Sequence, residues 1–311
     1  MSAVKSTLWT HTGNPYHVFK LLNEDPRIPK TTIARKLKIN EKTAEKWYND
    51  AVALRIIIPP FFRRKSFTNF REYFYFINTN DPYECYQRMK SKKEVMYCTV
   101  QSGFSDIQII SKTPLNLEEE VILSGERSDY YVSTPKDQMF EKANQIMERK
   151  LKTIDDFEPT PSPLTLRKEP YSQWDDLDEA VYYSLMGNLR KPWAHVLKES
   201  GAYNNKIMHW YRTRNEFGHT ITMFFPEGEK AYQPTLFAIE TENDALLIDI
   251  FSEMPTSSVF YRLHKYVVMV LYVSYPIIAK SMVRRVLSYL QKKELIGKYI
   301  NSIVEYYYRE D

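Results

Sequence analysis

Apolar residues recur at the three- and four-residue spacing of amphipathic helices between residues 16 and 54. This spacing predicts three short helices, over residues 16–23, 31–37 and 41–54, and Asn40 is a natural N-cap for the third. In the third helix Ala44, Tyr48 and Ala51 form one inward stripe. The following segment, RIIIPPFFRRKSF, combines a β-branched run, a Pro-Pro turn and basic residues, and it predicts a two-stranded wing.

From residue 71 the pattern changes to the short, aromatic-rich runs of strands. Strands are predicted at REYFYFINTN, MYCTVQ, DIQIIS and YYVST, and helices at DPYECYQRMKSK and NLEEEVILSG, which gives the order βαββαβ. Residues 234–310 predict the same order, from PTLFAIETEN to IVEYYYRE. Because the strands are apolar on two faces, we expect each sheet to be covered by its own helices and by another sheet.

The chain repeats itself at an offset of 163 residues. Trp47-Tyr48 returns as Trp210-Tyr211, and the same ungapped offset aligns ten further identities. These are Val18/Val181, Leu22/Leu185, Arg27/Arg190, Pro29/Pro192, Ile58/Ile221, Phe61/Phe224, Phe62/Phe225, Phe74/Phe237, Asn80/Asn243 and Asp81/Asp244. Twelve identities at one offset indicate an internal duplication, and an aromatic repeated at the same helix position is more often a core residue than a ligand contact.

The predicted fold class is therefore α+β, a tandem repeat of a winged helix-turn-helix followed by a ferredoxin-like βαββαβ module. The first copy is assigned to residues 1–66 and 67–137, and the second copy to residues 173–232 and 233–311. Residues 138–172 hold a charged helix candidate and then the Pro-rich DDFEPTPSPLTLRKEP, so they are expected to form a linker.

Charge and cysteine content narrow the setting of the protein. The net charge is only +4, but residues 28–65 hold ten Lys or Arg against three Asp or Glu, so the basic charge gathers on the first helical unit. Cys85 and Cys98 form neither a disulfide framework nor a metal knuckle. No signal peptide is expected at residues 1–14, and the apolar run at 266–279 is too short for a membrane helix and predicts a buried strand. A cytoplasmic location is expected.

This arrangement resembles the Lrp/AsnC, or feast/famine, family of transcriptional regulators, here duplicated in one chain. The most specific match is Ser102-Gly103-Phe104-Ser105-Asp106, which is similar to the Gly-x-x-Asp element of that family. The resemblance implies a RAM-type ligand-binding module, with Ser102, Gly103 and Asp106 beside a small effector such as an amino acid. The second copy, at LHKYVVMVL, lacks this element. From the residues alone, an Asp after a Gly turn can equally cap the turn through local hydrogen bonds.

The resemblance also implies double-stranded DNA as the partner, read by an exposed helix face and a wing. Bases and phosphates need side-chain donors, and the exposed positions of the two units supply them: Lys42, Thr43, Lys46, Asn49, Arg63, Arg64, Asn205, Lys206, His209, Arg212 and Arg214. Acidic residues lie beside Lys42, Thr43, Lys46 and Asn49 and would repel a polyanion; they are Glu41, Glu45 and Asp50. The alternative explanation for the basic residues is a solvated helix face. The expected protein is a homodimer or an intramolecular pseudo-dimer that does not bind membranes.

Catalytic chemistry is not expected from the sequence motifs. The six histidines are scattered, so no metal site is predicted, and the glycines match no nucleotide-binding loop, so no cofactor is expected. No nucleophile motif is present, and the chain is predicted not to be an enzyme, with no catalytic residues.

Two alternatives remain beside the regulator. One is an effector-sensing or assembly module without DNA binding. The acidic residues of the helix predicted at residues 41–54 favour it. The other is an enzyme like the sirohaem decarboxylases, which resemble feast/famine regulators and act as paired subunits. Such an enzyme would need His and Arg side chains over a tetrapyrrole, and Arg262, His264 and Lys265 form the only small cluster of that kind.

Overall fold

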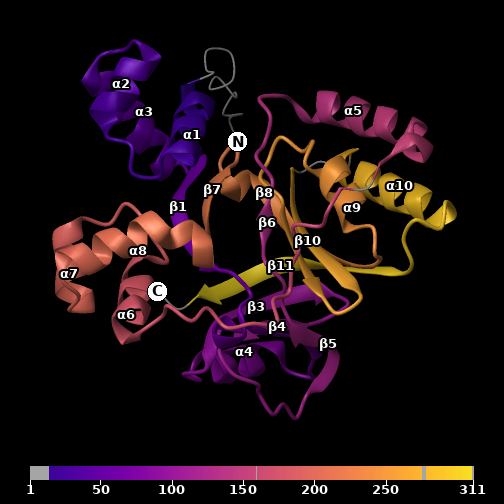
Figure 1. Ribbon diagram of the computed structural model, residues 1–311. Helices are drawn as coiled ribbons and strands as arrows, with labels where there is room; N and C mark the ends of the chain where they lie inside the picture. The colour runs from indigo at the N-terminus through magenta and orange to yellow at the C-terminus, as the bar shows by residue number, and fades with distance from the viewer. Residues whose placement is uncertain (1–13, 159, 275–277, 310–311) are drawn as a thin grey trace.

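Helices and antiparallel strands build a mixed α/β fold in the computed structural model, which describes residues 14–158, 160–274 and 278–309 (Figure 1). The expectation that no signal peptide is present concerns residues 1–14, nearly all of which lie outside the described residues. Residues 275–277 of the apolar run also lie outside them. Residues 266–274 of that run form strand β10 (Tyr266–Ser274), as predicted, whereas 278 and 279 begin helix α10 (Ile278–Lys292). Within the described residues, no helix combines the length and hydropathy needed to span a membrane.

Each half of the chain opens with three helices. They are α1 (Asn14–Glu24), α2 (Lys30–Leu37) and α3 (Glu41–Ala53) in the first half, and α6 (Asp176–Leu185), α7 (Trp193–Ser200) and α8 (Asn204–Phe217) in the second. α2 and α7, like α3 and α8, begin 163 residues apart. The Asn40 side chain accepts a hydrogen bond from the Thr43 N–H (2.7 Å), which confirms the predicted N-cap. Ala44 and Ala51 are buried, as the stripe predicted.

The segment predicted as a two-stranded wing is a single strand. β1 (Ile57–Arg64) runs through Pro59 and Pro60 and pairs antiparallel with β7 (Gly218–Phe224) of the second half, with a register shift between Ile58 and Phe61. Proline has no N–H to donate to a ladder, so the Pro-Pro pair is accommodated in this irregularity instead of forming a turn. The strand therefore links the two helical units to one another.

A nine-stranded sheet in the order β5-β2-β4-β3-β11-β8-β10-β9-β6 carries the rest of the fold. The first half contributes β2 (Tyr73–Asn78), α4 (Pro82–Lys90), β3 (Val95–Gly103), β4 (Ile107–Ser111), β5 (Glu120–Glu126) and β6 (Tyr131–Val132). The second contributes β8 (Tyr232–Glu240), α9 (Asp244–Phe251), β9 (Val259–Leu263), β10, α10 (Ile278–Lys292) and β11 (Tyr299–Arg309). Short 3₁₀ turns lie at Thr68–Phe70, Ile154–Asp156 and Glu229–Ala231.

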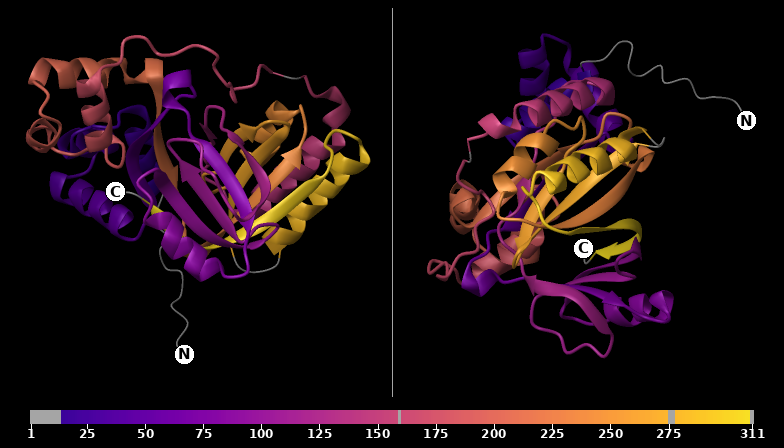
Figure 2. Two further views of the ribbon diagram at one scale, coloured as in Figure 1. Left: turned by 90° about the horizontal axis from the view of Figure 1, so that it is seen from below. Right: turned by 90° about the vertical axis from the view of Figure 1, so that its right-hand side faces the viewer.

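The two sheets expected from the sequence join within one chain. β11 pairs with β8 of its own half and with β3 of the first half. Close approach at this junction needs a glycine at position 103, where φ is +150° and a Cβ would lie 2.3 Å from the Asn301 carbonyl oxygen. At the far end β6 pairs with β9, and Arg127 forms a bridge with Leu263, so the sheet curls until its two ends meet (Figure 2).

The two halves differ where the second helix of each module was predicted. The second half has α10 there, but NLEEEVILSG of the first half forms β5, which pairs with β2. The β-branched Val121 and Ile122 suit a strand, and the pairing with β2 overrides the helix-forming glutamates. The predicted linker contains α5 (Phe140–Lys152), which packs on α9 and α10. These three helices lie together over one side of the second half of the sheet (Figure 1).

Candidate functional site

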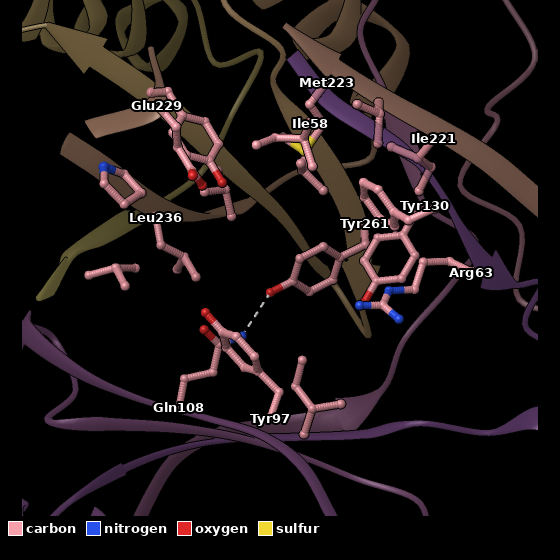
Figure 3. A pocket seen from close by; sticks show the side chains of 18 of the residues that line it. Ile58, Arg63, Tyr97, Gln108, Tyr130, Ile221, Met223, Glu229, Leu236 and Tyr261 are labelled. Carbon is pink, nitrogen blue, oxygen red and sulfur yellow. Dashed lines mark hydrogen bonds between the residues drawn. The ribbon is translucent and has the colours of Figure 1, made fainter. Parts of the chain in front are cut away.

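A cavity of about 930 Å³ lies between the β1–β7 ribbon and the nine-stranded sheet. Both halves line it: Arg63, Phe74, Tyr97 and Gln108 come from the first, and Leu236, Tyr261 and Val270 from the second, among other residues. The volume is at the upper end of the range of roughly 300–1,000 Å³ that is usual for small-molecule sites. The chain thus encloses between its two halves a space suited to one large ligand (Figure 3).

The walls are mainly apolar. The ribbon contributes Ile58, Phe61, Ile221 and Met223, and several strands of the sheet contribute alternate side chains, such as Val270 and Tyr272 of β10. Successive residues of a strand point to opposite faces, so the residues between these pack against the covering helices instead. The strands are therefore apolar on both faces for two reasons: one face packs against helices, and the other lines the cavity.

Two charged residues of the cavity wall differ in their partners: Glu72 forms an ion pair, and Arg63 does not. Glu72 lines the cavity and binds the buried Arg127, with 2.6 Å between Oε2 and Nε. Arg63 also lines the cavity, and its guanidinium has no carboxylate within ion-pair distance in the described part of the chain. It lies next to Tyr130 (Figure 3). A ligand anion would therefore find one free guanidinium here.

Two tyrosines of the cavity wall keep their protons. Burial raises the pKa of Tyr261, and the neighbouring Tyr130 and Tyr97 raise it further. Burial likewise raises the pKa of Tyr130, and Glu72 adds to the effect. The rings of Tyr130 and Tyr261 contact one another, with centroids 5.6 Å apart. Both hydroxyls are therefore neutral over the ordinary pH range and can act as hydrogen-bond donors.

The residues predicted to read DNA divide into exposed residues and residues that bind other parts of the chain. The exposed ones are Lys42, Lys46, Asn49, Asn205, His209 and Arg212. The backbone N–H of Thr43 donates to the Asn40 cap, Lys206 pairs with Asp175 and Asp178, and Arg214 binds the Thr220 hydroxyl and the Tyr211 carbonyl.

The two wing arginines turn inward. Arg63 faces the cavity, whereas Arg64 is buried, pairs with Glu179 (2.7 Å) and lies 4.2 Å from the ring centroid of Tyr182. The ribbon formed by β1 and β7 thus presents neither side chain to a duplex.

The residues predicted to bind an effector lie outside the cavity. Asp106 Oδ2 accepts a hydrogen bond from the Thr79 N–H (2.9 Å), which lies 27 residues away, so this contact joins two segments and is not the local turn cap weighed against an effector role. Gly103 packs against β11, and Ser102 is exposed. Effector contact by Ser102, Gly103 and Asp106 stays a prediction.

The histidine cluster lies elsewhere too. Arg262 and His264 line a separate, smaller cavity of about 330 Å³, and no histidine lines the large one among the described residues. Lys265 pairs with Glu240.

The comparisons with known proteins give a fold-level likeness. No protein-family model matches the chain, and no curated protein is significantly similar to it. Two solved structures are similar: the crystal structure of the siroheme decarboxylase NirDL, and NirDL in co-complex with an iron-uroporphyrin III analogue. Each is 11% identical to this chain, and each comparison covers 96% of this chain and 92% of the other, with TM-scores of 0.44 and 0.43.

This finding corrects the main functional prediction. Both similar structures are of an enzyme and not of a transcription factor, which contradicts the predicted feast/famine regulator and the expectation of a non-enzyme. Double-stranded DNA as a partner stays a prediction. The wing arginines do not favour DNA contact, because Arg64 is buried and Arg63 faces the cavity, whereas DNA recognition needs donors that can reach phosphates and base edges.

Sequence reasoning missed most of the cavity. Arg63 was singled out, but for DNA, and Tyr97, Gln108, Tyr130 and Tyr261 were not singled out at all. One signal was available: a glutamine at position 108 interrupts the otherwise apolar strand DIQIIS. A buried polar side chain requires partners, which points to a polar group nearby.

Proposed function

We propose that the chain is an enzyme that binds a large, flat tetrapyrrole bearing carboxylates in the central cavity and removes a carboxylate as carbon dioxide. The observation that carries this proposal is the unpaired Arg63 guanidinium on the wall of a large, mainly apolar cavity. Guanidinium groups bind carboxylates through two parallel hydrogen bonds. The choice of a tetrapyrrole follows the sequence-based alternative, and the iron-uroporphyrin analogue bound by NirDL belongs to the same chemical class.

The two kinds of wall have different roles in such a reaction. Arg63 would anchor one carboxylate and so orient the macrocycle. A second carboxylate that lies against Leu236 and Val270 is desolvated, which favours loss of carbon dioxide because the charge spreads as the bond breaks. The bond between the side-chain carbon and the carboxylate carbon breaks, and the electron pair stays on the side-chain carbon until a proton replaces the lost group.

The test uses the full-length protein with sirohaem and with iron uroporphyrin. Absorbance titration measures binding, and mass spectrometry of the extracted tetrapyrrole detects the loss of carbon dioxide. Replacing Arg63 by Met keeps an unbranched apolar side chain and removes the guanidinium with its charge. Loss of a charge-assisted hydrogen bond costs about 1.5–3 kcal/mol, so we expect the dissociation constant to rise roughly 10- to 100-fold.

Arg212→Met is the matched control, because Arg212 is exposed on α8 away from the cavity. Its affinity for the tetrapyrrole should equal that of the wild type. The proposal is refuted if the wild type binds neither tetrapyrrole, or if both are recovered unchanged after incubation at saturating protein.

We further propose that the two halves are copies of one unit, a winged helix-turn-helix followed by a βαββαβ module, whose helical part now serves as an internal interface. Arg27 donates hydrogen bonds to the carbonyls of Leu189 and Lys191, and Arg190 donates to those of Pro26 and Ile28. These partners are also 163 residues apart, so the contact is reciprocal.

The repeated aromatic pair supports the same reading. The Arg27 guanidinium carbon lies 5.8 Å from the ring centroid of Tyr211, and that of Arg190 lies 5.2 Å from the ring centroid of Tyr48. Trp210 is a buried core residue, 1% exposed. The echo of Trp-Tyr along the chain is thus explained by packing within and between two equivalent units. The chain forms an intramolecular pseudo-dimer on this proposal, and its location in the cytoplasm, favoured by the two unpaired cysteines, is likewise a proposal.

A further inference from the structure

A chain of buried polar side chains leads from the β3–β4 turn to the cavity. The Ser105 hydroxyl donates to Gln101 Oε1 (2.9 Å), and Gln101 Nε2 donates to Gln108 Oε1 (3.0 Å). Gln108 Nε2 then donates to the hydroxyl oxygen of Tyr261 (3.4 Å), as the dashed line in Figure 3 marks. Ser105, Gln101 and Gln108 are all buried. Because a buried polar group without a hydrogen bond is costly, these bonds hold the three side chains in place.

The direction of these hydrogen bonds decides whether the Tyr261 hydroxyl can donate to a ligand. Every donor along it points towards the cavity, and a phenol has one hydrogen and one acceptor oxygen. Because the Tyr261 oxygen accepts from Gln108, its hydrogen is left for another partner. No other hydrogen bond of Tyr261 exists in the described part of the chain, and the residue lines the cavity. The free hydrogen is therefore available to an occupant of the cavity.

We infer that Tyr261 is the proton donor to the carbon that loses its carboxylate, with Gln108 as the residue that positions it. This inference rests on the proposed function. It concerns a residue from strand β9 of the second half and a glutamine from β4 of the first half, so the reacting group is assembled only when both halves close around the cavity.

The carbon–carbon bond to the carboxylate breaks, carbon dioxide leaves, and the electron pair on the side-chain carbon takes the Tyr261 hydroxyl proton. The resulting tyrosinate accepts the Gln108 N–H, a contact that lowers the pKa of Tyr261 and opposes the larger effect of burial, which raises it. A proton from solvent restores the neutral phenol. No oxidant, reductant or metal is consumed, and the neutral resting state follows from the raised pKa.

The test replaces Tyr261 by Phe, which removes one oxygen atom and keeps the ring that contacts Phe74 and Tyr130. A positioned general acid contributes typically about 10²- to 10⁴-fold to a rate. We expect kcat for carbon dioxide release from sirohaem to fall at least about 100-fold, while KM and the affinity for iron uroporphyrin change little. Gln108→Leu should give a smaller fall in kcat, because Tyr261 keeps its hydroxyl but loses its orientation.

Tyr182→Phe is the matched control, since Tyr182 is a buried tyrosine that does not line the cavity. It should leave kcat unchanged. The outcomes separate the two proposals. An active wild type with an inactive, ligand-binding Tyr261→Phe variant supports the proton donor. If Tyr261→Phe retains wild-type kcat, the assignment is overturned and the decarboxylase proposal stands. If the wild type neither binds nor converts a tetrapyrrole, both are overturned.

Discussion

Replacing Glu72 by Gln tests the ion pair that closes one end of the cavity. The Glu72 and Arg127 side chains are 4% and 1% exposed, and their charged atoms are 2.6 Å apart. The substitution keeps shape and volume but leaves the Arg127 guanidinium buried without a counterion. Removing one partner of a buried pair typically costs about 3–5 kcal/mol. Arg127 retains hydrogen bonds to the carbonyls of Ser128 (2.7 Å) and Arg64 (2.8 Å), so we expect the lower end, about 3 kcal/mol.

The assay is urea unfolding followed by circular dichroism, at neutral and at acidic pH. Burial raises the pKa of Glu72, but Arg127, with Arg63 and Arg64, more than offsets this and holds the pKa below its ordinary value. A carboxylate with a lowered pKa stabilises the fold above its unfolded pKa, and that stabilisation is lost as the pH falls through the folded pKa. The difference between Glu72→Gln and wild type should therefore shrink in acid.

Two comparisons keep this reasoning open to refutation. Glu45→Gln breaks an exposed pair with Lys30 and should leave the urea midpoint almost unchanged. Replacing both partners by apolar residues, Glu72→Leu with Arg127→Met, should restore most of the lost stability, since no buried charge is left unpaired. If Glu72→Gln unfolds at the same urea concentration as the wild type at neutral pH, the pair does not stabilise the fold and the argument is wrong.

Arg27→Ala and Arg190→Ala should each lower the free energy of unfolding, by about 1–2 kcal/mol because both side chains are partly exposed. Similar urea midpoints for the two variants would support equivalent roles, whereas an effect of only one would contradict them. Met147→Ala removes a fully buried side chain of α5 and should cost about 2–5 kcal/mol. Lys142→Ala, on the exposed face of α5, is its control; equal midpoints for these two variants would mean that α5 does not pack stably on the second half.

Local patterns carried much of the secondary structure. The three-residue apolar spacing and Asn40 placed the first helices because capping and amphipathicity act within one or two turns. Local sequence patterns gave the wrong secondary structure where strand pairing between distant segments determines it. Residues 116–125 have helix-forming glutamates, yet β5 forms there because β2 offers a partner, and the Pro-Pro segment becomes β1 because β7 lies beside it.

The sequence by itself indicated that the chain is duplicated, since identical residues at one offset need no structure to be seen. Only the tertiary structure decided what the duplication builds. Arg63, Gln108 and Tyr261 are far apart in the sequence and carry no shared motif. They meet because β3 and β11 join the two halves into one curled sheet and β1 pairs with β7 across it. A cavity formed between two halves depends on how their surfaces meet, and no local pattern of residues encodes that.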